Sequence, residues 1–352
     1  MSNTAISLFS GMGGDSLGII QAGYKLIAYC EKEKIFQNSH DENFKNCNLL
    51  GNGDITKVRD DEFNKYKGVD LIFAGFPCQG FSQAGKKLPN DPRNTLFREF
   101  VRATRIIKPK FIIGENVKGL LKRKTDTGDN YIDIIKNEFS NIGYNITYKV
   151  MKANLHLVPQ KRERLIIVGI RNDIPIEYEF PEDLQDNTHL EHIVKFSMEG
   201  SIKMEPTNFD FSTIPEECIL TDMNNCETEQ NPHPNLRLLA TDRNFVYKGK
   251  TYESRLTFGK RTPIGGEIID IRRPCKTIIC TYARCPRLFV PLRNKNGYYL
   301  RCLLPKELQQ IQGFPKKFKV CGNKSKQIIQ IGNAVPPPLI KSIIDNIHKS
   351  TR

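Results

Sequence analysis

The stretch Val69-Asp-Leu-Ile-Phe-Ala-Gly-Phe-Pro-Cys-Gln-Gly-Phe-Ser82 decides how this chain is expected to fold. Its first six residues form an apolar run that predicts a buried strand, and a Pro-Cys turn follows the strand closely. Doubly wound sheets bind ligands in the crevice beyond the carboxyl ends of their strands, which is where this turn would project. Cys78 is therefore a candidate nucleophile. An inert structural cysteine explains a lone residue of this kind about as well.

Strand patterns and helix patterns alternate through the first half of the sequence. This order predicts an α/β fold with a doubly wound, mostly parallel sheet that is covered by helices on both faces. The expected strands are residues 4–9, 26–30, 69–74, 111–114, 144–150 and 165–170, and the expected helices are residues 15–22, 94–107 and 129–142.

The pattern changes in the second half of the sequence. Residues from about 172 to 272 are polar and irregular, and helical patterns return at 305–311 and 339–348. This stretch is either a long insertion or a second, smaller irregular domain, and a structureless loop of that length is improbable in a compact protein. We predict that residues 1–178 and 303–352 form one domain and that residues 179–302 form the other.

The composition is that of an ordinary globular protein, with 39% hydrophobic and 26% charged residues among 352. No apolar run is long enough to cross a bilayer, and no basic segment precedes the first apolar stretch as in a signal peptide. We therefore expect an intracellular protein, located in the cytoplasm and at the nucleoid if the host is bacterial. The ten cysteines include no Cys-x-x-Cys pair, which favours reduced thiols and predicts no metal site.

The formal net charge of +14 suggests a polyanionic partner such as nucleic acid. The chain is also rich in Asn and Ile, and A+T-rich coding would raise Lys together with both. The charge thus supports nucleic-acid binding without establishing it.

Glycines and acidic residues follow the first two expected strands. The segment Phe9-Ser-Gly-Met-Gly-Gly14 joins the first strand to the first helix, where glycine lets the backbone approach a ligand closely. Glu31 ends the second strand, a common position for a residue that holds ribose hydroxyls. Asp54 is either an acceptor for an adenine amino group or a plain turn residue. A nicotinamide dehydrogenase could show the same arrangement.

Two further segments carry polar side chains to the same sheet edge. Glu115 and Asn116 follow the strand at 111–114, where a carboxylate can hydrogen-bond or protonate a heterocyclic nitrogen, or simply cap a helix. In Gln160-Lys-Arg-Glu-Arg164, the alternating residues Gln160, Arg162 and Arg164 enter a buried strand from one face. That spacing favours an inward-facing clamp for an anion or a carbonyl over a solvated charge run.

Taken together, these motifs resemble those of the cytosine-C5 methyltransferases that use S-adenosylmethionine. The similarity covers about residues 1–171 and 273–340 and leaves the middle hundred residues unmatched. Each motif is weak alone, but the ordered set is specific. In order, the matching segments are Phe9–Gly14, Glu31, Asp54, Pro77–Gln79, Glu115–Val117, Gln160–Arg164, Arg273-Pro274 with Thr277, Gln312–Pro315, and Gly332–Val335 followed by three prolines.

The resemblance implies a class I, Rossmann-like methyltransferase that flips cytosine out of a DNA duplex. Cys78, as a thiolate, would attack carbon 6 of the base and make carbon 5 nucleophilic towards the methyl group. Glu115 would contact the ring nitrogen N3 and the exocyclic amine. Arg164 would contact the ring carbonyl, and Arg162 would support the active-site loop or bind a phosphate.

The same resemblance assigns the residues that bind cofactor and substrate. The stretch Ser82–Leu96 is similar to the family's mobile loop, with Lys87 where the family often has Arg and Asn94 near a usual Gly. The implied S-adenosylmethionine pocket contains Phe9, Gly11, Gly13, Glu31, Asp54, Ile55, Pro77, Leu96, Asn333 and Val335, with the C-terminal segment folded back beside the first strand. The implied substrate-binding residues are Gln79, Ser82, Lys86, Lys87, Arg93, Asn116 and Gln160.

Three classes of function are weighed. A DNA cytosine-C5 methyltransferase accounts for every motif. The relatives that modify transfer RNA carry a Cys-Phe-Thr tripeptide, which is absent here, and a dinucleotide-binding oxidoreductase leaves Cys78 and Arg164 unexplained. The expected partners are double-stranded DNA and, in a restriction–modification system, a cognate restriction endonuclease; the chain is expected to be a monomer that contacts no membrane. Residues of the middle segment that could contact DNA are Arg237, Arg243, Arg255, Lys260 and Arg261.

Overall fold

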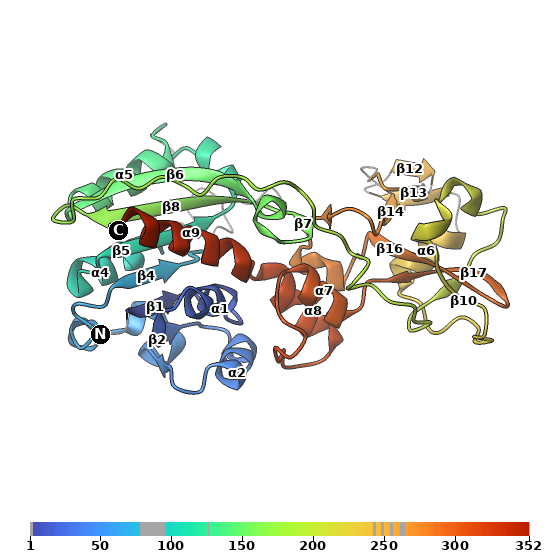
Figure 1. Cartoon of the computed structure of the whole chain (residues 1–352), viewed down its shortest axis with the longest axis horizontal. Coiled ribbons are helices and arrows are strands. Elements are labelled where there is room, and N and C mark those ends of the chain that lie inside the picture. The colour runs from blue at the N-terminus through green and yellow to red at the C-terminus, as the bar shows by residue number, and fades with distance from the viewer. Residues whose placement is uncertain are drawn as a thin grey trace.

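The computed structural model describes residues 3–77, 96–125, 127–241, 244–247, 250–253, 256–260 and 265–351. Two large sheets organise these residues into two lobes (Figure 1). A seven-stranded sheet uses strands from residues 4–171, and a six-stranded sheet uses strands from residues 202–302. Helices α7 (Pro305–Ile311) and α8 (Lys324–Asn333) lie between the lobes.

The seven-stranded sheet is mostly parallel, as the sequence predicts. Strands β1, β2, β3, β4 and β5 pair in parallel, whereas β8 is antiparallel to both of its neighbours. The strand order reverses between β1 and β4, and such a switch point is where doubly wound sheets bind ligands. In spatial order the strands are β3 (Asn48–Leu49), β2 (Lys25–Cys30), β1 (Thr4–Leu8), β4 (Leu71–Ala74), β5 (Phe111–Asn116), β8 (Glu163–Arg171) and β6 (Tyr144–Lys152).

Both faces of this sheet are covered by helices, which is why its central strands read as continuous apolar runs. Every residue of β4 and β5 is buried. Ala5 and Leu71 share a core cluster with Ile344 of the last helix, whereas Ile6 and Ile72 share another with Phe100. Two helices contribute to the first cluster, α1 (Gly14–Gln21) and α9 (Pro337–Ser350). Two others contribute to the second, α4 (Phe97–Ile107) and α5 (Tyr131–Ser140).

Helix α9 returns from the far end of the sequence to pack against α1, and Figure 1 shows it lying along the sheet. The two helices approach so closely that a Cβ on Gly18 would lie 2.6 Å from the carbonyl oxygen of Pro337. A Cβ on Gly14 would overlap the carbonyl oxygen of Val335. Glycine is therefore required at both positions, and the C-terminal segment lies beside the first helix.

Four α-helices form where the sequence pattern predicts none. These are α2 (Lys34–Asn43), α3 (Asp60–Asn64), α6 (Pro234–Thr241) and α8. Each has five to ten residues, too few for a stable isolated helix, so packing against the rest of the molecule stabilises them.

The six-stranded sheet and its surroundings form the second lobe, which corresponds to the irregular second half of the sequence. Residues 172–201 contain neither helix nor strand. The sheet has the strands β13 (Leu256–Phe258), β14 (Gly266–Ile268), β16 (Leu288–Asn294), β17 (Gly297–Cys302) and β9 (Ile202–Lys203), with β10 (Leu220–Asp222) paired to β16. The other elements are α6 (Pro234–Thr241), the hairpin of β11 (Asn244–Tyr247) and β12 (Lys250–Glu253), and the pair of β7 (Gln160–Lys161) and β15 (Cys275–Lys276).

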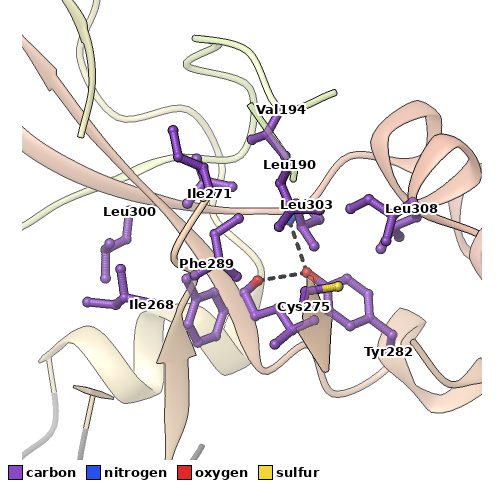
Figure 2. Close-up of a cluster of buried hydrophobic side chains, with 14 of the residues drawn as sticks. Leu190, Val194, Ile268, Ile271, Cys275, Tyr282, Phe289, Leu300, Leu303 and Leu308 are labelled. Carbon is purple, nitrogen blue, oxygen red and sulfur yellow. Dashed lines mark hydrogen bonds between the residues drawn. The ribbon is translucent and has the colours of Figure 1, made fainter. Parts of the chain in front are cut away.

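The hydrophobic core of the second lobe continues into the helices between the lobes. Phe289 and Leu300 of its sheet belong to the same cluster as Leu308 of α7 (Figure 2). Tyr282 joins two segments of this core, because its hydroxyl donates to the carbonyl of Leu288 at 2.8 Å and accepts from the amide of Leu303 at 3.0 Å. The exact boundary of the second domain stays a prediction. Across the described residues, no helix has the length and apolar character needed to span a bilayer.

A buried carboxyl group lies in the first turn of α1. Asp15 is 2% exposed and accepts a hydrogen bond from the hydroxyl of Ser7 on β1. Its pKa is raised from 3.8 to about 7, mainly by burial and to a lesser extent by the nearby charge of Glu115, while hydrogen bonds from Ser7 and the backbone oppose the shift. A neutral carboxyl group thus lies below the edge of the sheet at slightly acidic pH.

We expect Asp15 to make the free energy of unfolding decrease as pH rises. Its pKa is higher in the folded state, so between about pH 4 and pH 7 the folded protein holds a proton that the unfolded chain has lost. Within this window the free energy of unfolding should fall by ~1.4 kcal/mol for each pH unit, and above the window it should stop falling for this reason. Asp15→Asn should remove this contribution when urea unfolding is measured from pH 5 to 8. Asp133→Asn, at an exposed position in the first turn of α5, should not; equal slopes for wild type and Asp15→Asn would refute the assignment.

Candidate active site

The ends of three parallel strands meet at the switch point. Leu8 of β1 pairs with Ala74 of β4, which in turn pairs with Gly114 of β5. The residues that follow therefore leave the sheet at the same level. A Cβ on Gly75 would lie 3.7 Å from the carbonyl oxygen of Phe9 and 3.8 Å from Oε2 of Glu115.

Glu115 forms an ion pair with Arg164 at this edge. The antiparallel direction of β8 brings its first residues next to the carboxyl end of β5, and Nε of Arg164 lies 2.7 Å from Oε1 of Glu115. The side chains are only 14% and 12% exposed, so solvent screens the pair weakly. Sequence reasoning placed both residues in the site but did not predict that they pair with each other. The pair fixes the carboxylate at the carboxyl end of β5.

Asn116 anchors the turn that leads to the candidate nucleophile. Its side-chain amide donates to the carbonyl of Phe76 at 3.2 Å, and its Oδ1 accepts from the amide of Val117 at 2.9 Å. Pro77 is half-buried next to this turn. The segment 78–95 lies outside the described residues, and with it Cys78, Gln79, Ser82, Lys86, Lys87 and Arg93.

The loop between β1 and α1 is tied to the end of β2 by Glu31. The amide of Gly11 donates to Oε2 of Glu31 at 2.8 Å, and the amide of Glu33 donates to Oε1 at 2.8 Å. Burial raises the pKa of Glu31, and these two backbone amides lower it. Phe9, Gly11 and Gly13 all have positive φ angles, of 58°, 57° and 95°. The loop therefore curls back towards the carboxylate, and Phe9 is a non-glycine residue in this strained region.

Asp54 lies next to Glu31 because Gly53 packs against the Glu31 backbone, where a Cβ would overlap the carbonyl oxygen. Asp54 accepts from the amide and hydroxyl of Thr56, and Lys32 lies 3.1 Å away. The hydrogen bond from Thr56 is the main cause that lowers its pKa. Its carboxylate thus caps a short turn and keeps its charge near Glu31.

The remaining expected cofactor residues come from three separate elements. Ile55 is buried at 4% exposed, and Leu96 is half-buried just before α4. Asn333 is exposed at the end of α8, and Val335 is buried with its carbonyl against Gly14. The C-terminal segment therefore reaches the loop after β1, as the resemblance implies.

Gln160 and Arg162 both hydrogen-bond to the backbone of Ile278 and not to Glu115. Both are buried, and Arg162 donates to the carbonyls of Ile278 and Gly332 at 2.9 and 3.2 Å. These backbone contacts lie outside residues 82–96, so the expected support of the active-site loop by Arg162 stays a prediction, and the burial of the side chain leaves no surface for a phosphate to contact. The alternating pattern of residues 160–164 indicated inward-facing side chains but could not identify their partners.

The candidate recognition residues are only partly described. Arg237 pairs with Glu229 at 3.1 Å, and Lys260 is exposed. Arg243, Arg255 and Arg261 lie outside the described residues. Among the described residues, no group of three or more His, Cys, Asp or Glu could hold a metal ion, and the cysteines there are free.

Two buried residues beside the site could not be identified from the sequence pattern. Asp15 gave no signal because a helix N-terminus commonly carries an aspartate. Gln312 belongs to a matched motif but had no expected role, and its contacts with Gln160 and with the end of α8 depend on tertiary structure.

Comparison with known proteins agrees with this geometry. The family described as C-5 cytosine-specific DNA methylase matches residues 3–349. Type II methyltransferase M1.HphI of Haemophilus parahaemolyticus is 31% identical over 359 residues, covering 99% of this chain and 87% of the relative. M.Eco47II of Escherichia coli is 32% identical over 366 residues, covering 98% and 80%. The solved structure of a Spodoptera frugiperda DNMT2 mutant shares the fold, with a TM-score of 0.68, 17% identity, and coverage of 99% of this chain and 100% of that one.

The family match spans nearly the whole chain, and the relatives align along most of their own length. The chain therefore belongs to the C-5 cytosine-specific DNA methylase family and is a DNA (cytosine-5-)-methyltransferase.

Proposed function

We propose that this enzyme transfers a methyl group from S-adenosylmethionine to carbon 5 of a cytosine in a specific sequence of double-stranded DNA. The target base is flipped out of the duplex, because its ring is unreachable while stacked. The observation that carries the proposal is the Glu115–Arg164 pair at the edge of the sheet, beside the turn that leads into Pro77-Cys78.

The residues around the loop after β1 fit S-adenosylmethionine. Gly11 has open space on its Cβ side, since the nearest atom there is a ring carbon of Phe36 at 3.8 Å. Glu31 is held in place by two backbone amides and is positioned to accept from ribose hydroxyls. Asp54 offers a second acceptor for an amino group on the adenine. When bound, the cofactor supplies an electrophilic methyl group.

The proposed chemistry assigns one task to each residue at the sheet edge. The thiolate of Cys78 adds to carbon 6, and the electron pair of the 5,6 double bond becomes available at carbon 5. Glu115 contacts N3 and accepts a hydrogen bond from the exocyclic amine, and Arg164 donates to the ring carbonyl. After carbon 5 gains the methyl group, a base removes its proton, and the electron pair returns to expel the thiolate.

The pairing of Glu115 with Arg164 supports these tasks. The guanidinium of Arg164 already holds the carboxylate in place before the base enters. The free-energy cost of reorganising the site during the reaction is therefore smaller. The remaining carboxylate oxygen, Oε2, faces the backbone near Gly75 and is the atom available to the substrate.

We further propose that residues 1–178 and 303–352 form the catalytic domain and that residues 179–302 form the target-recognition domain. The strands of the seven-stranded sheet and its covering helix α9 fall within the first set, and those of the six-stranded sheet fall within the second. The charge of +14 favours binding along the DNA backbone. Because the relatives M1.HphI and M.Eco47II are named Type II methyltransferases, we propose a role in a restriction–modification system.

A covalent adduct tests the nucleophile. DNA with 5-fluorocytosine at the target position should form a denaturation-resistant complex with the enzyme in the presence of S-adenosylmethionine, because fluorine blocks the final elimination. Cys78→Ser should abolish the complex on a denaturing gel. Cys226→Ser, at an exposed cysteine, is the control and should leave the complex intact. Full trapping by Cys78→Ser would disprove the assignment.

The carboxylate is tested by Glu115→Gln. This variant should bind S-adenosylmethionine normally but transfer the methyl group slower by one or more orders of magnitude, about the contribution of a positioned acid. Single-turnover kinetics with saturating cofactor measures the step. Glu163→Gln is the control, because Glu163 starts the same strand as Arg164 and pairs with Lys118 at the surface. An unchanged rate for Glu115→Gln would remove this residue from the mechanism.

The cofactor pocket is tested by Glu31→Ala and Asp54→Ala. Each should weaken S-adenosylmethionine binding by ~1.5–3 kcal/mol, typical of a hydrogen bond to a charged group. Calorimetry gives the affinity, and DNA affinity without cofactor should change little. Glu33→Ala, at the neighbouring exposed carboxylate, serves as control. Tight binding of a nicotinamide dinucleotide in place of S-adenosylmethionine would favour the oxidoreductase alternative.

A further inference from the structure

Three buried side chains form a polar hub between the two lobes. Gln160 and Gln312 are fully buried, and Arg162 is 1% exposed. Burying amides and a guanidinium is costly unless hydrogen bonds replace the lost water. The partners of these side chains therefore indicate what the hub does.

Gln312 makes three hydrogen bonds, two to the end of α8 and one to Gln160. Its Nε2 donates to the carbonyl of Ile331 at 3.0 Å and to that of Ala334 at 2.6 Å. Its Oε1 accepts from Nε2 of Gln160. Gln160 in turn accepts at Oε1 from the amide of Ile278, at 2.9 Å. A chain of hydrogen bonds thus runs from the end of α8, through two amide side chains, to residue 278.

Arg162 completes the hub at the same helix end. It donates to the carbonyls of Gly332 and Ile278, and no carboxylate pairs with it among the residues that the structure describes. The last carbonyls of a helix lack intrahelical partners and carry partial negative charge, which favours a cation. This explains how a guanidinium is buried here, although burial and the charge of Arg164 lower its pKa.

The hub holds three functional segments together. Arg164, which pairs with Glu115, lies two residues beyond Arg162. Asn333 and Val335, which we place at the cofactor, flank the carbonyls that Gln312 and Arg162 hold. Ile278 lies in the polypeptide segment that leads into the second lobe. It follows β15, in which Cys275 pairs with Gln160 of β7.

The end of α8 is in close contact with the segment that follows Ile278, which leaves the helix end little room to shift. A Cβ on Gly332 would overlap the amide nitrogen of Cys280 and lie 2.5 Å from the carbonyl carbon of Ile279. The end of α8 is therefore pressed against the segment after Ile278. A displacement of the helix end would have to move the hub as well.

We propose that Gln312 is a positioning residue that sets the cofactor side of the active site relative to the base side. It acts by fixing the end of α8, and with it Asn333 and Val335, against the strand that carries Arg164. This inference rests on the proposed cofactor site.

The test replaces Gln312 with methionine, which has a similar volume but no amide. At saturating DNA, Gln312→Met should raise the KM for S-adenosylmethionine about tenfold, the scale of one lost buried hydrogen bond, with a smaller change in kcat. Gln309→Met is the matched control. Gln309 is also buried, lies on helix α7 three residues before its C-cap Gln312, and donates only to the carbonyls of Pro315 and Phe318. Both variants should lose thermal stability, but only Gln312→Met should change the KM.

The design separates positioning from a purely structural role. An unchanged KM for Gln312→Met, or an equal rise for Gln309→Met, would overturn the proposal. If Gln312→Met fails to fold, Gln160→Met removes the next link of the chain and should raise the KM in the same direction; an unchanged value would again refute the inference. Calorimetry with S-adenosylhomocysteine on the wild-type protein tests the cofactor site separately. No binding there would disprove the proposed function, whereas binding that Gln312→Met leaves intact would disprove this inference alone.

Discussion

The parallel register of β1, β4 and β5 brings together the residues at the edge of the sheet. Leu8, Ala74 and Gly114 are paired across these strands, so Phe9, Gly75 and Glu115 emerge at one level although they lie far apart in the sequence. Burial on both faces holds this register, because a slip of one residue would turn each apolar side chain to the opposite core. Hydrophobic packing thereby determines where the polar groups of the site meet.

The reversed strand β8 adds the residue that the parallel strands cannot supply. Its antiparallel direction places Arg164, at the beginning of a strand, beside Glu115, near the end of one. A poorly solvated ion pair contributes little net stability, because desolvation offsets the attraction between the charges. Its value lies in geometry: it orders a carboxylate beside the backbone of Gly75.

The C-terminal segment packs against the first helix and against the second lobe. Helix α9 packs on α1 through glycine contacts, and the end of α8 is held by Gln312 and Arg162. The helices α7 and α8 also share a core with the second lobe. The same short region therefore touches the loop after β1, the strand of Arg164 and the second sheet. Under our proposal, this junction positions the cofactor side of the site relative to the base side.

The sequence predicted most of the strand–helix order of the first half, the mostly parallel sheet and the motif residues at its edge, because these depend on local periodicity and on apolar runs such as 69–74. It did not predict α2 or α8, since short polar helices depend on packing. It also could not show that Glu115 pairs with Arg164, that Asp15 is buried beside Ser7, or that Arg162 faces a helix end instead of a phosphate. These contacts depend on tertiary structure because each joins residues from different elements. Which residues meet is set by the direction of the strands and by the burial of the side chains, and neither can be read from a local sequence pattern.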